Sequence, residues 1–174
     1  MNINFKKLIK PTQEIAATFN KWANDPYLRP RIRPNHTKEE LEKPGSVTVD
    51  LLSRHLDDHI TFLIFADGHL VGEMNYHIDP DYLFKNDAGT AWVGIVIGEK
   101  SARRKGIGEQ AMNFLESKIK AQGLKRIELG VFEFNTNAIK LYQKMGFQEI
   151  GRIENFTYWE GRMWCDIRME KYLE

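Results

Sequence analysis

The stretch from 92 to 110, WVGIVIGEKSARRKGIGEQ, constrains the fold more than any other part of the sequence. It begins with a short apolar run rich in β-branched residues, 92–98, which predicts a strand buried on both faces. A charged connection follows, and Gly106-Ile107-Gly108 then opens a helical pattern. A strand buried on both faces must be covered on each side, so the sequence predicts a layered fold around this strand.

The glycine-rich turn at the start of that helix predicts a site for phosphate groups. Glycines let bare backbone N–H groups approach a ligand closely, and the helix dipole adds partial positive charge at the same place. Arg103, Arg104 and Lys105 come directly before the turn. Three cations beside a group of amides favour a ligand with more than one phosphate.

Two general phosphate motifs were compared with this turn. The P-loop pattern does not fit, because Lys105 precedes Gly106 and no hydroxyl follows. The dinucleotide fingerprint fits by letter from Gly106 to Ala111, with an acid further on at Glu128 or Glu133. Its context is different, since seven residues separate the strand from the first glycine and only one βαβ unit is visible.

Length and charge restrict the class of protein. A chain of 174 residues is enough for one domain with a sizeable core, and we expect a single domain over 1–174. The net charge of +1 gives no case for a nucleic-acid or membrane partner. The single cysteine and the absence of a signal-peptide pattern at the start predict a soluble protein of the cytoplasm.

Hydrophobic periodicity predicts an α+β fold with a mixed, mostly antiparallel sheet of about seven strands and about four helices. The expected strands are 3–9, 61–66, 69–78, 92–98, 126–131, 147–158 and 163–173, and the expected helices are 12–24, 47–58, 106–122 and 136–145. The helix between 92–98 and 126–131 makes those two strands parallel. Prolines in 27–34 predict a loop, and the three arginines crowded there indicate either a solvated connection, the commoner case, or a flap over a charged ligand. The last strand is expected to be an exposed edge or a dimer seam.

Neither the histidines nor the cysteine indicates a metal site or a nucleophile. His55 and His59 are four residues apart, which is a spacing that can hold a metal. The residue after the first histidine is Leu56 rather than the glutamate of metalloproteases, and no third ligand is evident, so we expect no metal. Cys165 alternates with apolar residues and is expected to face the core, which argues against a nucleophilic role.

A second group of polar residues lies on the last expected helix. Asn135, Ala138 and Tyr142 are three and seven residues apart and therefore share one helix face. Ala138 leaves room for a ligand, Asn135 can hydrogen-bond it and Tyr142 can supply a proton. A buried tyrosine with a satisfied hydroxyl is the simpler interpretation of this pattern alone.

Together these motifs resemble the GNAT superfamily of N-acetyltransferases. The pattern Arg or Gln, two residues, Gly, any residue, Gly or Ala is matched from Arg103 to Gly108. A later signature is matched by Asn135, Ala138, Ile139, Leu141, Tyr142, Lys144, Gly146 and Phe147. Gly151-Arg152 and the segment from Asp166 to Met169 resemble the branch that includes ribosomal-protein N-terminal acetyltransferases.

The resemblance implies acetyl-CoA as co-substrate, held where the sheet splays beside the central strand. Backbone amides of Arg103, Arg104, Lys105, Gly106, Ile107 and Gly108 would hold the pyrophosphate, Ile95, Val96 and Ile97 would pair with the pantetheine arm, and Asn135 and Ala138 would lie beside it. Tyr142 would be the general acid. An amide near Gly94 or Ile95 would stabilise the oxyanion, and Glu73, Glu133 or a water chain would be the base that deprotonates the attacking amine.

Three functions stay open from the sequence. The first is direct acetyl transfer in a ternary complex to a primary amine of a peptide, polyamine or aminoglycoside. Acids at Asp79, Asp81 and Asp87 favour a cationic acceptor if they lie near the acceptor mouth, although a solvated loop explains them equally well. The second is a CoA-binding module without catalysis, and the third is a nucleotide-dependent oxidoreductase. A homodimer is also compatible with the sequence.

Overall fold

Seven strands form one mixed sheet in the computed structural model, which describes residues 1–174. The strand order is β1-β2-β3-β4-β5-β7-β6, and only β4 and β5 run parallel. The bounds are β1 Ile3–Lys7, β2 His59–Ala66, β3 His69–Ile78, β4 Thr90–Ile97, β5 Arg126–Phe132, β6 Gln148–Trp159 and β7 Arg162–Tyr172. All seven predicted strands are present, so the predicted α+β fold with its mixed sheet is confirmed.

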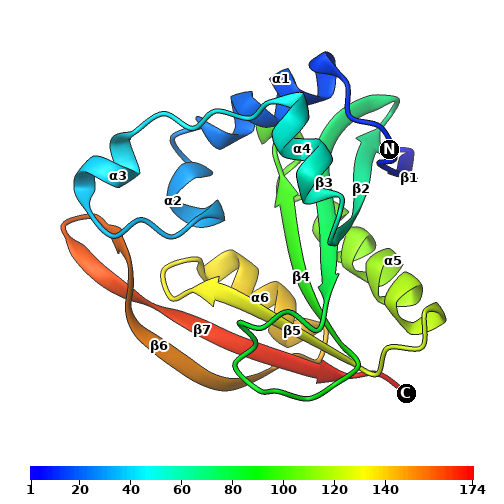
Figure 1. Cartoon of the computed structure of the whole chain (residues 1–174), viewed down its shortest axis with the longest axis vertical. Helices are drawn as coiled ribbons and strands as arrows, with labels where there is room; N and C mark the ends of the chain where they lie inside the picture. The colour runs from blue at the N-terminus through cyan, green and yellow to red at the C-terminus, as the bar shows by residue number, and fades with distance from the viewer.

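Six helices and one 3-10 turn accompany the sheet. They are α1 Gln13–Ala23, α2 Arg29–Ile32, α3 Lys38–Glu42, α4 Val49–His55, η1 Lys100–Ala102, α5 Ile107–Ala121 and α6 Thr136–Lys144. The four predicted helices correspond to α1, α4, α5 and α6. In Figure 1, α1 to α4 lie together across the upper part of the view, and α6 and the β6–β7 hairpin lie below them. None of the helices combines the length and apolar character needed to cross a bilayer.

Helix α2 contradicts the prediction of a loop over 27–34. Proline excludes only the interior of a helix, because its missing N–H is not needed in the first turn. Pro30 occupies that first turn, and the four-residue helix begins directly before it. Pro30 and Leu28 are both buried, so this segment is packed onto the protein rather than solvated.

The parallel pair at the centre of the sheet is joined over a short distance only. β4 and β5 pair at Thr90–Arg126, Ala91–Ile127 and Trp92–Glu128, and no pairing follows. On its other side β4 stays paired to β3 as far as Ile97. Beyond Trp92, the backbone groups of β4 that are directed towards β5 therefore have no strand partner. The splay that the sequence analysis expected beside this strand is present.

Helices α5 and α6 lie beside each other over the core of the sheet. α5 buries Ile107, Ala111, Met112, Leu115 and Ile119 in the same cluster as Met74 and Tyr76 of β3. A Cβ on Gly108 would stand 3.3 Å from the Leu141 side chain of α6, so the start of α5 nearly touches α6. Alternate residues of β3, including Glu73, Asn75 and His77, point to the opposite face.

Two expectations about the last strand are wrong. β7 lies between β5 and β6, so β6 is the outer strand on that side. Cys165 is partly exposed rather than part of the core. The alternation of apolar residues along a strand defines neither which strands it pairs with nor how deeply each side chain is buried.

Candidate active site

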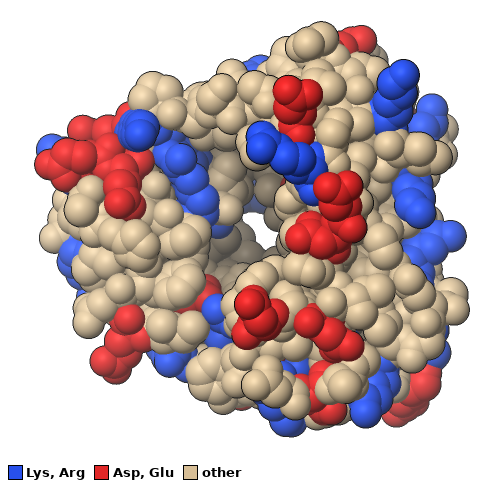
Figure 2. Space-filling model, viewed as in Figure 1, with Lys and Arg blue, Asp and Glu red and all other residues tan.

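A cavity of about 970 Å³ lies between α2, β4 and α6. Figure 2 shows the same region as an opening at the centre of the molecule, with basic side chains along its upper left rim and acidic ones along its right and lower rim. Its volume is at the upper end of the range for ligand-binding clefts. The lining includes ten of the predicted site residues: Ile95, Val96, Ile97, Arg103, Arg104, Gly106, Gly108, Asn135, Ala138 and Tyr142.

The start of α5 presents free amides to this cavity. Gly106 has φ +76°, a conformation that glycine adopts without cost, and Arg104 before it has φ +59°. No side chain caps the helix, and its first helical hydrogen bond runs from the Gln110 amide to the Gly106 carbonyl. The amides of Ile107 and Gly108 therefore lack intrahelical partners, and they point towards the helix N-terminus, where an anion is favoured.

Arg103 is already held by the protein. Its guanidinium donates hydrogen bonds to the carbonyls of Ile97 and Gly98 at 3.1 and 2.7 Å, and lies 3.6 Å from the Asp25 carboxylate. It also lies 4.8 Å from the centre of the Tyr27 ring. The side chain thus ties the end of β4 to the segment before α2, and of the three predicted cations Arg104 and Lys105 remain solvent-accessible.

Two predicted phosphate-site residues do not line the cavity with their side chains. Ile107 is 1% exposed and packs in the core, and Lys105 is exposed and is not part of the cavity lining. The prediction for these positions concerned backbone amides, so it is unaffected by where the side chains point.

Gly98, directly after β4, has no room for a side chain, because a Cβ there would lie 2.1 Å from the Trp22 ring.

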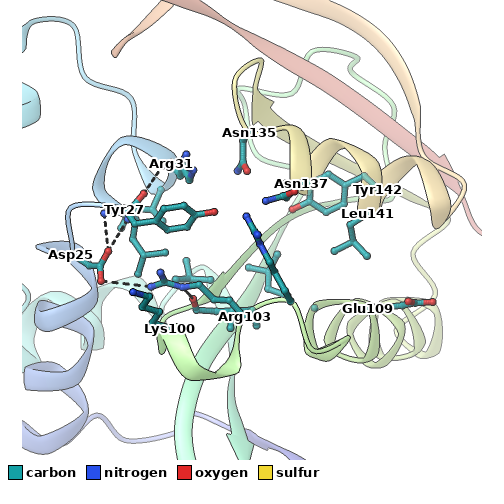
Figure 3. Close-up of a pocket in the computed structure, with 18 of the residues that line it drawn as sticks. Asp25, Tyr27, Arg31, Lys100, Arg103, Glu109, Asn135, Asn137, Leu141 and Tyr142 are labelled. Atoms are coloured by element: carbon teal, nitrogen blue, oxygen red, sulfur yellow. Dashed lines mark hydrogen bonds and ion pairs between the residues drawn. The ribbon is translucent and has the colours of Figure 1, made fainter. Parts of the chain in front are cut away.

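Helix α6 supplies the opposite wall. Figure 3 shows Asn135, Asn137 and Tyr142 on this wall, facing Tyr27 and Arg31 across the cavity. Asn135 occupies the N-cap position but makes no capping hydrogen bond. Its amide is therefore available to a ligand.

Tyr142 is buried yet reaches the cavity. It is 9% exposed, and its hydroxyl points into the cavity beside Asn137 (Figure 3). Burial raises the pKa of Tyr142 to about 12. The phenol therefore stays protonated at neutral pH and can act as a proton donor.

Glu73 lies on β3, on the face of the sheet opposite α5. It is paired in register with Val96, which lines the cavity, and its carboxylate accepts a hydrogen bond of 3.2 Å from the Asn75 amide. Burial raises the pKa of Glu73 to about 7, and this hydrogen bond opposes the change only partly. A carboxylate with this pKa is suited to exchange protons near neutral pH.

Like Glu73, Glu133 lies outside the cavity lining, and it follows the end of β5 directly. Its carboxylate is 3.7 Å from the guanidinium of Arg152. Desolvation raises the pKa of the Cys165 thiol, and a hydrogen bond with Glu133 and the negative charge of Glu133 raise it further. A paired, partly exposed carboxylate is less suited to accept a proton from a substrate than Glu73 is.

The acids between β3 and β4 have mostly structural roles. The Asp79 carboxylate accepts hydrogen bonds from the amides of Gly89 and Thr90 and closes the loop. Asp87 accepts from the Tyr172 hydroxyl at 2.7 Å and pairs with Lys125. Only Asp81 of the three is left exposed without such a partner.

Ten further residues line the cavity that the sequence did not indicate as part of a site. They are Asp25, Pro26, Tyr27, Leu28, Arg31, Ile32, Lys100, Glu109, Asn137 and Leu141. Six of these belong to the segment that was interpreted as a loop or to the turn before it. The three crowded arginines of 27–34 were the one signal for them, and Arg31 lies 4.0 Å from the Tyr27 ring and 5.2 Å from the Trp159 ring.

Residues 17–147 match the Acetyltransferase (GNAT) family, which is most of the chain. The chain belongs to this family. Its glycine turn, splayed strands and α6 tyrosine are thus parts of a GNAT acetyltransferase domain, as the resemblance of the two motifs implied.

Individual relatives cover this GNAT domain to different extents. A probable spermine N(1)-acetyltransferase of Bacillus subtilis subsp. natto is 34% identical over 92 residues, which are 52% of this chain and 60% of that protein. The chain thus spans less than two thirds of that relative's length. A spermidine N-acetyltransferase from Vibrio cholerae, solved with CoA and spermine, has a TM-score of 0.75 and 18% identity over 98% of this chain and 95% of that one.

A ribosomal-protein-alanine N-acetyltransferase from Brucella melitensis has a TM-score of 0.73 at 20% identity, over 99% of this chain and 100% of that one. Identities this low establish the shared fold and not the acceptor. The similarity to the ribosomal-protein branch therefore stays a prediction.

Proposed function

We propose that this GNAT chain transfers acetyl from acetyl-CoA to a primary amine by direct attack in a ternary complex. The observation that carries the proposal is the splay of β4 from β5 after Trp92, which opens beside the free amides of the α5 turn. When bound, acetyl-CoA supplies the activated acetyl thioester and a thiol leaving group.

The residues present fit this co-substrate at its pyrophosphate and along its pantetheine arm. The uncapped amides at Ile107 and Gly108 suit the pyrophosphate, and a Cβ-sized space beside Gly106 is open. The unpaired side of β4 at Ile95, Val96 and Ile97 suits the two amides of a pantetheine arm, which would pair as an added strand. Asn135 and Ala138 would border its thiol end.

Two side chains are assigned to proton transfer. Tyr142, protonated at neutral pH, holds a proton at its hydroxyl on the cavity wall and is the proposed general acid. Glu73 is the proposed general base, because its pKa of about 7 allows it to be ionised at the pH where an amine must lose a proton. Glu133 is the weaker candidate, since Arg152 already compensates its charge.

The acceptor class is proposed as a small cationic amine of the polyamine type. The spermine acetyltransferase relative supports it by sequence, at 34% identity, whereas the ribosomal-protein acetyltransferase shares the fold alone. Acidic side chains along the right and lower rim of the opening, opposite the basic ones at its upper left, would offer a polycation its charge partners (Figure 2). We further propose a cytoplasmic location, and the outer strand β6 as the surface for a homodimer.

An amine panel tests the activity. Thiol release from acetyl-CoA is measured with spermine, spermidine, an aminoglycoside and a peptide with a free α-amine. We expect turnover with the polyamines and little with the peptide. Turnover with the peptide alone would refute the acceptor class. Binding of CoA without turnover on any amine would favour the alternative, a non-catalytic CoA-binding module, and protection from thermal unfolding by NAD but not by acetyl-CoA would favour an oxidoreductase.

A further inference from the structure

Three of the five histidines of the chain meet at one place outside the cavity. His55 ends α4, His59 begins β2 and His77 lies near the end of β3. The rings of His55 and His59 stack with their centres 3.7 Å apart, and the rings of His59 and His77 are 4.6 Å apart. His59 and His77 are also direct partners in the antiparallel register of β2 and β3, so the sheet itself holds them together.

A carboxylate completes this cluster. Asp58 and His59 are hydrogen-bonded, with 2.5 Å between Oδ1 and Nδ1. Asp58, His59 and His77 each offer one ligand atom, and these three atoms lie within 4.8 Å of one another. Small rotations of the side chains bring such a set to the separations of ligands around one ion, because bonds of about 2.0–2.2 Å from zinc place its ligands roughly 3–3.5 Å apart.

The third ligand that the sequence did not reveal is thus provided by the fold. His77 is far from His55 and His59 along the chain, and only the β2–β3 pairing brings it beside them. A second layer of contacts is also present, since the Tyr82 hydroxyl lies 3.3 Å from Nδ1 of His77. Such partners fix the orientation of an imidazole and leave its other nitrogen free for an ion.

We propose that Asp58, His59 and His77 form a binding site for one divalent ion of the zinc type, beside the stacked ring of His55. Two imidazoles and one carboxylate are donors that Zn²⁺ takes, whereas Ca²⁺ and Mg²⁺ prefer oxygen alone. The side chain of Asp58 is 56% exposed and that of His59 is 16% exposed, so an ion reaches the site from solvent.

The position of the site gives it a structural role. It joins the end of α4 to β2 and β3, and Tyr82 extends it to the loop before β4. The Tyr82 ring meets the Trp92 ring edge-on at 5.3 Å, and Trp92 is the residue at which β4 and β5 part. A bound ion would fix this border of the sheet face opposite α5. The inference does not depend on the proposed acetyl transfer.

Titration of the untagged, EDTA-treated chain with Zn²⁺ tests the site by calorimetry and thermal unfolding, and the visible spectrum of bound Co²⁺ reports the ligands. We expect one ion per chain and a rise in Tm on binding. His59→Gln, His77→Gln and Asp58→Asn should each weaken binding by about tenfold or more. His69→Gln is the matched control, because His69 is exposed on the same hairpin and outside the cluster.

The Tm of each variant in EDTA identifies any variant that fails to fold, and Asp58→Asn alters an exposed side chain and leaves the sheet intact. Binding by the His69 variant equal to wild type, together with loss in the others, supports the site. The proposal is overturned if the wild-type chain binds no stoichiometric Zn²⁺, or if the folded cluster variants bind it as tightly as wild type does.

Discussion

At the scale of single residues, burial raises the pKa of both Tyr142 and Glu73, but only the shift of Glu73 places a pKa near neutral pH. The pKa of Tyr142 rises to about 12, so its hydroxyl is protonated at neutral pH, as that of a free tyrosine also is. The pKa of Glu73 rises to about 7, so its carboxylate is partly ionised there. Tyr142 lines the cavity, whereas Glu73 lies behind its lining, next to Val96 in the sheet.

Replacing Tyr142 by Phe removes the proposed proton donor with little change of shape. We expect kcat to fall by about 10²–10⁴-fold, the usual contribution of general acid catalysis, while CoA affinity stays within about twofold. Steady-state kinetics and calorimetry measure the two quantities. The control is Tyr76→Phe, which changes a buried tyrosine that is bonded to Gln122 and lies outside the cavity. A Tyr142 variant as active as this control would remove the assignment.

Replacing Glu73 by Gln tests the base through pH. The base must be deprotonated, so kcat/KM of the wild type should rise with pH through about 7 and then level off. The variant should lose most of this activity and the step near pH 7. If its profile keeps the same step, another group is the base.

The same substitution has a predictable effect on stability. A carboxyl whose folded pKa is raised from 4.5 to about 7 destabilises the folded state as pH rises between these values, because its ionised form is disfavoured by burial. Glu73→Gln should therefore increase Tm relative to wild type at pH 8 and leave it nearly unchanged at pH 4. A Tm difference that is the same at both values would contradict the cause assigned to the shift.

At the scale of elements, the α5 turn depends on the backbone of Gly106. Alanine there meets no neighbouring atom within 4 Å, so the cost arises from the left-handed conformation alone, about 1 kcal/mol. Gly161 in the β6–β7 turn has φ +80° and the same open surroundings, which makes Gly161→Ala a matched control. Both variants should lose similar free energy of unfolding, measured in denaturant.

Only Gly106→Ala should also weaken CoA binding, by about tenfold, because a residue that resists this conformation redirects the amides behind it. Calorimetry with CoA measures the difference. Equal CoA affinity in the two variants would show that the turn does not hold the ligand.

Elements with strong local signals were predictable, and short or distantly paired ones were not. Alternating apolar residues and the Asp67-Gly68 turn placed β2 and β3, and the apolar face of α5 placed that helix. Helices α2 and α3 contain four and five residues, too few to show a helical period. The cavity wall from Asp25 to Ile32 was missed with them. The interior position of β7 depends on pairing with β5, for which the local sequence carries no signal.

At the scale of the whole molecule, the cavity lies at an opening through the centre of the protein (Figure 2), bordered by α2 on one side and α6 on the other. Two ligands that enter from opposite ends can be bound together, so no acetyl group needs to be stored on the protein. Cys165 is poorly suited to store one, because desolvation and the nearby Glu133 raise the pKa of its thiol.

Direct transfer predicts two results from kinetics. Initial-rate lines at several fixed amine concentrations should intersect, and Cys165→Ser should keep kcat within about twofold of wild type. Parallel lines together with an inactive serine variant would instead indicate an acetyl-cysteine intermediate.

The early end of the β4–β5 ladder also bears on solubility. Unsatisfied strand backbone is normally a hazard, because it invites another polypeptide to add itself and begin aggregation. Here the bare stretch after Trp92 lies in the cavity, with α2 and α6 on its two flanks, rather than at an outer edge of the sheet. The unpaired backbone of β4 thus stays available to a bound co-substrate without forming an outer sheet edge to which another chain could add.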